Sequence, residues 1–179
     1  MIRRIAAATA ALGLVAAGAI ALAPAASATG TSTTKGTTTV TLTDAALGAL
    51  GPLSPSAVSP ATLGAGATGV EAAFPITKAK DGRISHSGGL RFTKGKITLK
   101  LTNYVIDTTT GKLTARVTIN GFSLIRIPLF DVALKAPAAG CDASADLTLT
   151  RTGSVALRVL FGTPNLTGAP IGSACVDLP

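Results

Sequence analysis

The sequence predicts an all-β fold, an antiparallel β-sandwich or open barrel with one or two short helices. Thr, Val, Leu and Gly are abundant after the first 28 residues, and these residue types favour strands and turns. Many short stretches alternate apolar and polar residues and are separated by Gly, Pro, Asn or Asp. One pair of these stretches also carries a hairpin signal, Lys94-Gly95, between them.

Residues 1–28 have the pattern of a signal peptide. Arg3 and Arg4 precede an apolar, Ala-rich stretch, and Ala26-Ser27-Ala28 is the small-x-small sequence that signal peptidase accepts. The alternative is a retained transmembrane helix, because about 19 apolar residues just span a bilayer. A polar run follows, and Ala and Gly drive insertion weakly, so we expect cleavage. The mature chain is then secreted or extracellular, with cell-wall association left open, and it contacts the membrane only during export.

Residues 29–37 are predicted to be a flexible polar leader, and residues 38–179 a single β-rich domain. Removing 28 of 179 residues leaves about 151, which suits one domain with a real core. The net charge of +8 falls to +6 without the two arginines of the signal peptide. The charges are scattered, and no basic cluster is interleaved with aromatic residues, so nucleic acid is not expected as a partner. Attraction to an acidic cell-wall polymer stays open.

The two cysteines, Cys141 and Cys175, are predicted to form a disulfide bond. Outside the membrane an isolated pair usually does so. A closed loop of about 35 residues stabilises the fold by about 3–4 kcal/mol in the chain-entropy model. A metal site would need histidine or further cysteines nearby, and the only histidine lies far away in the sequence.

The hairpin signal sets the predicted register of two strands, residues 83–92 and 96–107. A two-residue loop at Lys94-Gly95 places Phe92 opposite Ile97 and Leu90 opposite Leu99, so that the apolar side chains share one face. A third strand, residues 112–120, adds Val117 opposite Leu101. The other face of this sheet carries polar and basic side chains, namely Arg91, Thr93, Thr98, Lys100, Thr102 and Arg116.

The remaining elements follow from alternation, caps and breakers. Further strands are predicted at residues 38–43, 70–76, 124–134, 145–150 and 171–178. Pro128 inside one of them indicates an edge or a bulge. Short helices are predicted after Asp44 and over residues 153–161, the second with Thr152 as its cap. The proline-rich residues 52–60 are predicted to be irregular.

The candidate ligand-binding residues are His86, Asn103 and Tyr104. The predicted register puts His86 on the apolar face opposite Asn103, where a buried imidazole would find a hydrogen-bond partner. This pair is either structural or part of a ligand pocket. Tyr104 falls on the opposite face, as an outward strand tyrosine or a phenolate ligand for ferric iron. A bulge at Gly88-Gly89 would change which face His86 takes.

The sequence predicts no catalytic residues and no metal site. It contains no Gly-x-Ser-x-Gly elbow, no His-Glu-x-x-His pair and no phosphate-binding glycine loop. One histidine and eight acidic residues leave little material for a triad or a metal cage. We therefore expect a protein that is not an enzyme.

Several short motifs resemble secreted bacterial HtaA-like domains. They are Phe74-Pro75-Ile76-Thr77, residues 82–92 (GRISHSGGLRF), residues 111–117 (GKLTARV) and residues 168–174 (GAPIGSA). The resemblance implies a β-rich domain at the cell surface. It also implies haem capture through an N-terminal motif with Trp, Ser and an iron-ligating Tyr, which a histidine supports. His86 matches that histidine. The N-terminal part of this chain has no Trp and no Tyr, and Tyr104 is not at the ligand position, so the resemblance is to a relative without the ligating motif.

The sequence therefore predicts a secreted, non-enzymatic binding module at the cell surface. Its ligand is expected to be haem or another hydrophobic molecule, with no cofactor certain. The alternative is a structural or cell-wall-associated module that binds acidic polymers through the basic strand face.

Overall fold

The structure is a computed structural model that describes residues 36–50, 53, 55–66 and 69–178. The predicted signal peptide and residues 29–35 of the predicted leader lie outside the described residues. The elements, in chain order, are β1 (Thr37–Leu42), α1 (Asp44–Leu50), β2 (Pro55–Val58), β3 (Thr62–Gly66), β4 (Gly69–Lys80), β5 (Arg83–His86), β6 (Gly89–Lys94), β7 (Ile97–Asp107), β8 (Lys112–Ile119), β9 (Phe122–Lys135), β10 (Ala143–Leu149), α2 (Arg151–Phe161) and β11 (Pro170–Asp177).

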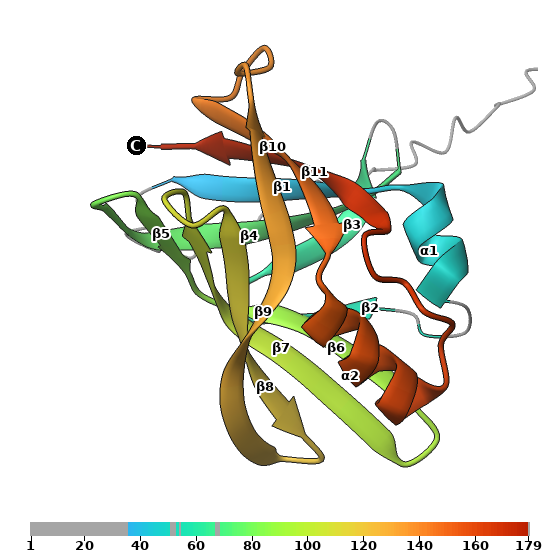
Figure 1. Ribbon diagram of the computed structural model, residues 1–179. Helices are drawn as coiled ribbons and strands as arrows, with labels where there is room; N and C mark the ends of the chain where they lie inside the picture. The colour runs from blue at the N-terminus through green and yellow to red at the C-terminus, as the bar shows by residue number, and fades with distance from the viewer. Residues whose placement is uncertain (1–35, 51–52, 54, 67–68, 179) are drawn as a thin grey trace, which may run out of the picture. The chain divides into compact units, whose positions relative to one another are not determined.

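Eight of the strands form a closed antiparallel barrel (Figure 1). The order of hydrogen-bonded neighbours is β7-β5-β4-β1-β11-β10-β9-β8, and pairing of β8 with β7 closes the ring. The other three strands extend it, because β6 pairs with β7, β2 with β6, and β3 with β4. The predicted all-β class, antiparallel pairing and two short helices are confirmed. Closure removes the unpaired strand edges that an open sheet would leave exposed.

The β6–β7 hairpin has the predicted faces but a different register. Lys94 pairs with Ile97, so the loop is Gly95-Lys96, and Phe92 pairs with Leu99 instead of Ile97. Gly95 has a φ of 57° at the first loop position, where a type II′ hairpin turn requires a positive φ. The predicted loop was therefore one residue too early. Because the pairing changes by two positions, every side chain keeps its face, and Phe92, Leu99 and Leu101 are buried.

A bulge in the middle of β7 reverses the alternation beyond it. Asn103 has a φ of 51°, and the β7–β8 register shifts between Thr102 and Val105. Before the bulge, Leu101 pairs with Val117 as predicted. After it, Ile84 pairs with Ile106, and Ser85 pairs with Val105. The bulge thus turns Tyr104 into the barrel.

The second half of the chain closes the barrel and covers one side of it. The β8–β9 register shifts beside Pro128, which confirms the predicted bulge, and β9 pairs on both sides, so it is not an edge. The cap of α2 is Thr150, not Thr152: its hydroxyl accepts from the Gly153 N–H at 3.1 Å. The proline-rich residues 52–60, predicted to be irregular, contain β2, and β3 follows them.

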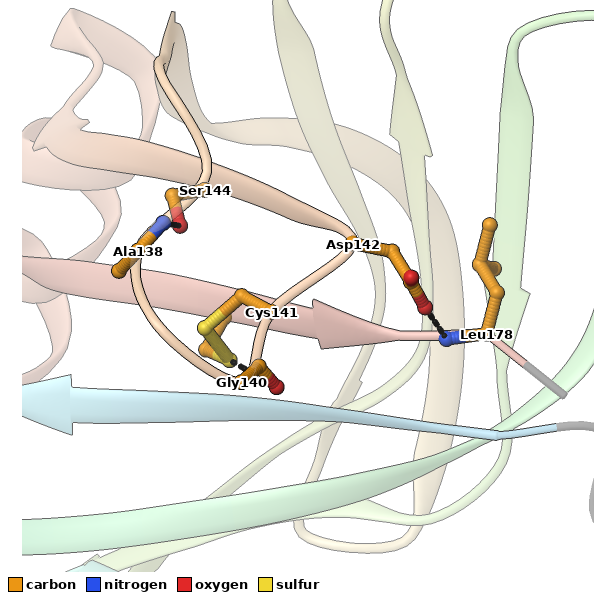
Figure 2. The surroundings of a disulfide bond; sticks show 7 residues. Ala138, Gly140, Cys141, Asp142, Ser144 and Leu178 are labelled. Atoms are coloured by element: carbon orange, nitrogen blue, oxygen red, sulfur yellow. Dashed lines mark hydrogen bonds between the residues drawn. A yellow bond between two sulfur atoms is a disulfide. The ribbon is translucent and has the colours of Figure 1, made fainter.

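The predicted disulfide bond is present. Cys141 and Cys175 lie with their Cα atoms 5.4 Å apart and join the segment before β10 to β11 (Figure 2). The Asp142 carboxylate beside it accepts from the Leu178 N–H at 2.6 Å, which holds the end of β11. These contacts fasten the strand that lies beside β1 in the ring.

Candidate ligand-binding site

His86 is the central polar group of the barrel interior. It is only 4% exposed, at the end of β5. Nδ1 lies 3.2 Å from the backbone oxygen of Tyr104, and Nε2 lies 2.8 Å from the hydroxyl of Thr38 on β1. A carbonyl oxygen can only accept, so Nδ1 carries the proton, and the Nε2 lone pair accepts from the Thr38 hydroxyl. Both ring nitrogens are therefore used within the protein.

Burial keeps this imidazole neutral. Desolvation lowers the pKa of His86 from 6.5 to about 4, and the hydrogen bond to the Tyr104 backbone acts in the opposite direction. The neutral ring can still make both hydrogen bonds, because the Thr38 hydroxyl can donate to Nε2. His86 is thus a satisfied structural group, and the prediction that it lies in the interior is confirmed.

Two other predicted placements are wrong. Asn103 is exposed at the bulge and does not contact the ring; its backbone oxygen accepts from Arg126 Nη1 at 2.7 Å. Tyr104 is 5% exposed, on the same side of the barrel wall as His86, and its ring packs edge-on against Phe74 at 4.9 Å. Burial raises the pKa of the Tyr104 phenol far above its usual range, so this tyrosine is not a phenolate.

The barrel encloses a small apolar cavity of about 60 Å³ beside these residues. Its walls come from buried side chains of the barrel strands, including Val40, Phe74, Leu101 and Tyr104. Pockets for ligands of drug size have volumes of roughly 300–1,000 Å³. The interior is therefore filled core with a small void.

A larger apolar site lies between α2 and the β8–β9 hairpin. This α2 groove has a volume of about 390 Å³. It is lined almost entirely by apolar side chains, namely Val117, Ile119, Leu124, Ile125, Ile127, Thr152, Val155, Ala156, Val159 and Leu160. Ile125 is 74% exposed and Val159 is 75% exposed. Large patches of exposed apolar residues are typical of interaction sites.

Two arginines flank the helix side of the α2 groove. Arg151 and Arg158 are exposed and lie four residues before and three residues after Val155, so they are its neighbours on the helix surface. Helix α2 contains no acidic residue. Among the described residues, neither arginine takes part in an ion pair. The rim of the groove is therefore positively charged.

The sequence predicted a helix over residues 153–161 but not this groove. The buried side of the helix includes Leu157 and Phe161, whereas Val155 and Val159 are exposed. The available signals were a helix with more apolar positions than one buried face needs and the apolar run Leu124-Ile125 in β9. Within the described part of the chain, no group of three or more His, Cys, Asp or Glu side chains gathers as a metal site. None of the described helices is long and apolar enough to cross a membrane.

Comparison with solved structures identifies the fold. The haem-binding protein HtaB from Corynebacterium glutamicum superposes with a TM-score of 0.53 at 13% identity, over 82% of this chain and 95% of that chain. The described barrel has the fold of HtaB. The C-terminal domain of HtaA from the same organism matches with a TM-score of 0.48 at 19% identity, over 80% of this chain and 98% of that chain. No protein-family model and no curated protein sequence matches. The HtaA-like resemblance seen in the sequence is thus confirmed for the fold.

The interior of this HtaB-like barrel does not fit a haem held through its iron. The Nε2 atom of His86 is already bonded to Thr38, the phenol of Tyr104 is buried and neutral, and the cavity beside them is several-fold too small. Thr38 occupies the hydrogen-bonding position beside the histidine, and a threonine hydroxyl does not replace a phenolate as an iron ligand. The described interior of the barrel therefore has no room for a ligand of that size.

Proposed function

We propose that this chain is an exported, non-enzymatic module that binds a hydrophobic, carboxylate-bearing small molecule in the α2 groove. The observation that carries the proposal is the exposed apolar groove itself, with its arginine rim. Its volume of about 390 Å³ falls within the range of small-molecule sites, in contrast to the interior cavity.

Apolar burial would supply most of the affinity. Each Å² of apolar surface removed from water contributes about 25 cal/mol. Ile125 and Val159 are each about three-quarters exposed, so both have surface left to bury against a ligand. Charged groups at the rim, Arg151 and Arg158, would pair with carboxylates that stay near water and fix the orientation of the ligand.

A porphyrin of the haem class matches this chemistry. It is a flat apolar macrocycle with two carboxylates on one edge. The HtaB-like fold supports this choice, because HtaB is described as a haem-binding protein. No His, Tyr, Cys or Met lines the α2 groove. We therefore propose that the macrocycle is held by apolar contact and carboxylate pairing, without iron ligation by the protein.

Export is part of the proposal. The sequence of residues 1–28 supports it, and so does the disulfide bond, since such bonds persist in oxidising compartments outside the cytosol. N-terminal sequencing of the protein recovered from culture medium would test it, with Thr29 expected as the first residue.

Absorbance and fluorescence titrations test the binding site. Hemin and iron-free protoporphyrin IX should bind with dissociation constants within about tenfold of each other, because the iron adds no bond to the protein. Val159→Asp should weaken both by at least about tenfold, since a carboxylate would be placed in the apolar contact. Arg158→Gln should weaken protoporphyrin IX more than its dimethyl ester.

The matched control is His86→Gln, which alters the interior and leaves the α2 groove intact. This variant should bind both porphyrins as the wild type does. Loss of hemin binding in His86→Gln, with Val159→Asp unaffected, would place the ligand inside the barrel and refute the proposal. Failure of both porphyrins to bind the wild type would refute the ligand class.

A further inference from the structure

A second surface, on the outer face of the barrel wall, carries four basic side chains in neighbouring strands. We call Arg91, Lys100, Arg116 and Arg126 the basic strip. The register places Arg91 on β6 opposite Lys100 on β7, and Arg116 on β8 opposite Arg126 on β9. Thr102, two residues after Lys100, lies opposite Arg116 and connects the two pairs. The strip therefore crosses four adjacent strands.

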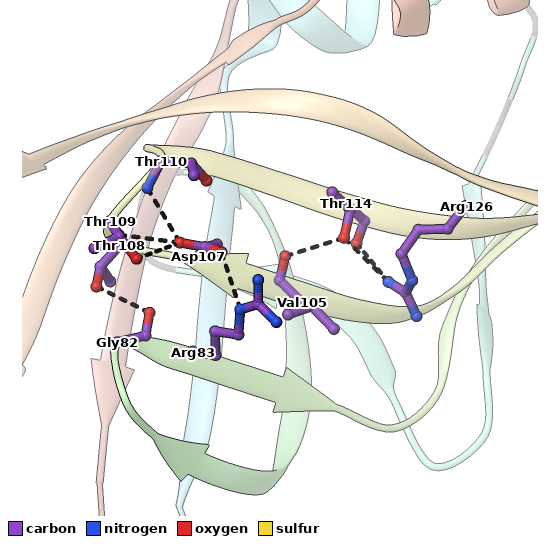
Figure 3. A network of polar contacts seen from close by, with 9 residues as sticks. All are labelled: Gly82, Arg83, Val105, Asp107, Thr108, Thr109, Thr110, Thr114 and Arg126. Carbon is purple, nitrogen blue, oxygen red and sulfur yellow. Dashed lines mark hydrogen bonds and ion pairs between the residues drawn. The ribbon is translucent and has the colours of Figure 1, made fainter.

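Like charges face each other directly within this strip. Cross-strand pairs of like charge destabilise a sheet, because their Cβ atoms lie only about 5 Å apart and the charges repel each other. Within the described ranges, none of the four side chains takes part in an ion pair. The only carboxylates of β6 to β9 are Asp107 and Asp131. Asp107 binds Arg83 at 3.0 Å and caps the turn at Thr109 and Thr110 (Figure 3), and Asp131 pairs with Lys112.

Arg126 is held in place at the end of the strip. Its Nη1 donates to the backbone oxygen of Asn103 at 2.7 Å. It also donates to the backbone and hydroxyl oxygens of Thr114, each at 3.2 Å (Figure 3). Burial lowers the pKa of this guanidinium, and the charge of Arg116 lowers it further. The Asn103 carbonyl at the bulge thus holds the Arg126 guanidinium in place beside the cationic Arg116.

We propose that the basic strip binds a linear polymer of phosphodiesters that carries no aromatic bases, of the polyglycerol-phosphate class. Directly opposed residues on neighbouring strands lie about 5 Å apart, and diagonal ones lie about 7–8 Å apart. This spacing suits a polymer that carries one phosphate oxyanion in each short repeating unit. Three of the four cations are arginines, which hold phosphate oxygens with two donors each. Thr98, Thr102 and Thr118 lie on the same face and add hydroxyl groups. Since no aromatic side chain lies on this face of β6 to β8, stacking on nucleobases has no partner there.

Binding of synthetic poly(glycerol phosphate) to the full-length mature protein at rising NaCl tests the proposal. The logarithm of the affinity should fall linearly with the logarithm of the salt concentration. The double variant Arg116→Gln/Arg126→Gln should bind at least about tenfold more weakly at low salt, with a slope reduced by about 1.4, or about 0.7 per lost contact. An oligothymidylate of equal charge should bind no more tightly than the polymer.

The matched control is Lys80→Gln/Lys135→Gln, which removes the same net charge from side chains outside the strip. This control should show the same dependence of affinity on salt concentration as the wild type. Equal losses in both double variants would mean that net charge alone drives binding, and would overturn the assignment to the strip. Oligothymidylate binding well above that of the polymer would overturn the partner class. Circular dichroism of each variant confirms that the barrel is folded.

Discussion

The buried imidazole of His86 should make the stability of the protein depend on pH between 4 and 7. In the folded state its pKa is about 4, whereas in the unfolded chain it returns to about 6.5. The neutral form is therefore the one that folding favours. The stability is fully present above pH 6.5 and is lost as the pH falls toward 4, because the unfolded chain then binds a proton that the folded protein does not.

The size of the effect follows from the two pKa values. Below pH 4 the difference between them lowers the free energy of unfolding by about 3 kcal/mol, at 1.36 kcal/mol for each unit of pKa difference. At pH 5 the loss amounts to about 2 kcal/mol relative to pH 7.5. The chain has a single histidine, and ordinary carboxyl groups titrate mainly below pH 5, so His86 dominates this interval.

Urea unfolding of the oxidised protein at pH 7.5, 6 and 5 measures this loss, with circular dichroism as the signal. The free energy of unfolding should decrease by about 2 kcal/mol across the series. His86→Gln should be less stable at pH 7.5, because its amide replaces the ring imperfectly, and its stability should be nearly independent of pH. A flat profile for the wild type, or the same slope in His86→Gln, would show that the imidazole is not buried and neutral.

Three further changes test the fold. Replacing both Cys141 and Cys175 with alanine should lower the free energy of unfolding by about 3–4 kcal/mol, measured by urea titration; no change would refute the stabilising role of the disulfide. Thr150→Ala should cost about 1–2 kcal/mol through the lost helix cap, whereas Thr152→Ala, at the predicted cap, should cost under about 0.5 kcal/mol. Gly89→Ala places a Cβ 2.0 Å from the Leu101 backbone oxygen and should lower the thermal midpoint, at a cost of about 1–3 kcal/mol; an unchanged midpoint would contradict this close approach.

Local signals in the sequence predicted most of the strands and their faces. Alternation around Leu113, Ala115 and Val117 identified the inner face of β8, and Pro128 identified the bulge in β9. The side-chain period of two explains why the faces of the β6–β7 hairpin survive a wrong register: a change of two positions alters the partners and keeps the faces.

The errors at the candidate site have one physical source. A single asparagine with positive φ, Asn103, inserts a residue into β7 and turns Tyr104 inward. Asparagine adopts this conformation more readily than most residues, but its type alone does not say that it will. The partner of His86, Thr38, lies 48 residues away on β1, and only barrel closure brings the two together.

The α2 groove could not be predicted for a related reason. Alternation and helical periodicity show which apolar side chains share a face. They do not show which of two apolar faces packs against the rest of the protein. Val155 and Val159 have the same residue type as core valines, and only the tertiary structure shows that they remain exposed.

Methyl NMR of the Ile, Leu and Val side chains during titration with iron-free protoporphyrin IX tests the binding proposal most directly. The methyl signals of Ile125, Val155 and Val159 should shift progressively with ligand, and those of the interior residues Leu99 and Leu147 should stay in place. Methyl shifts confined to Leu99 and Leu147 would place the ligand within the barrel and contradict the account.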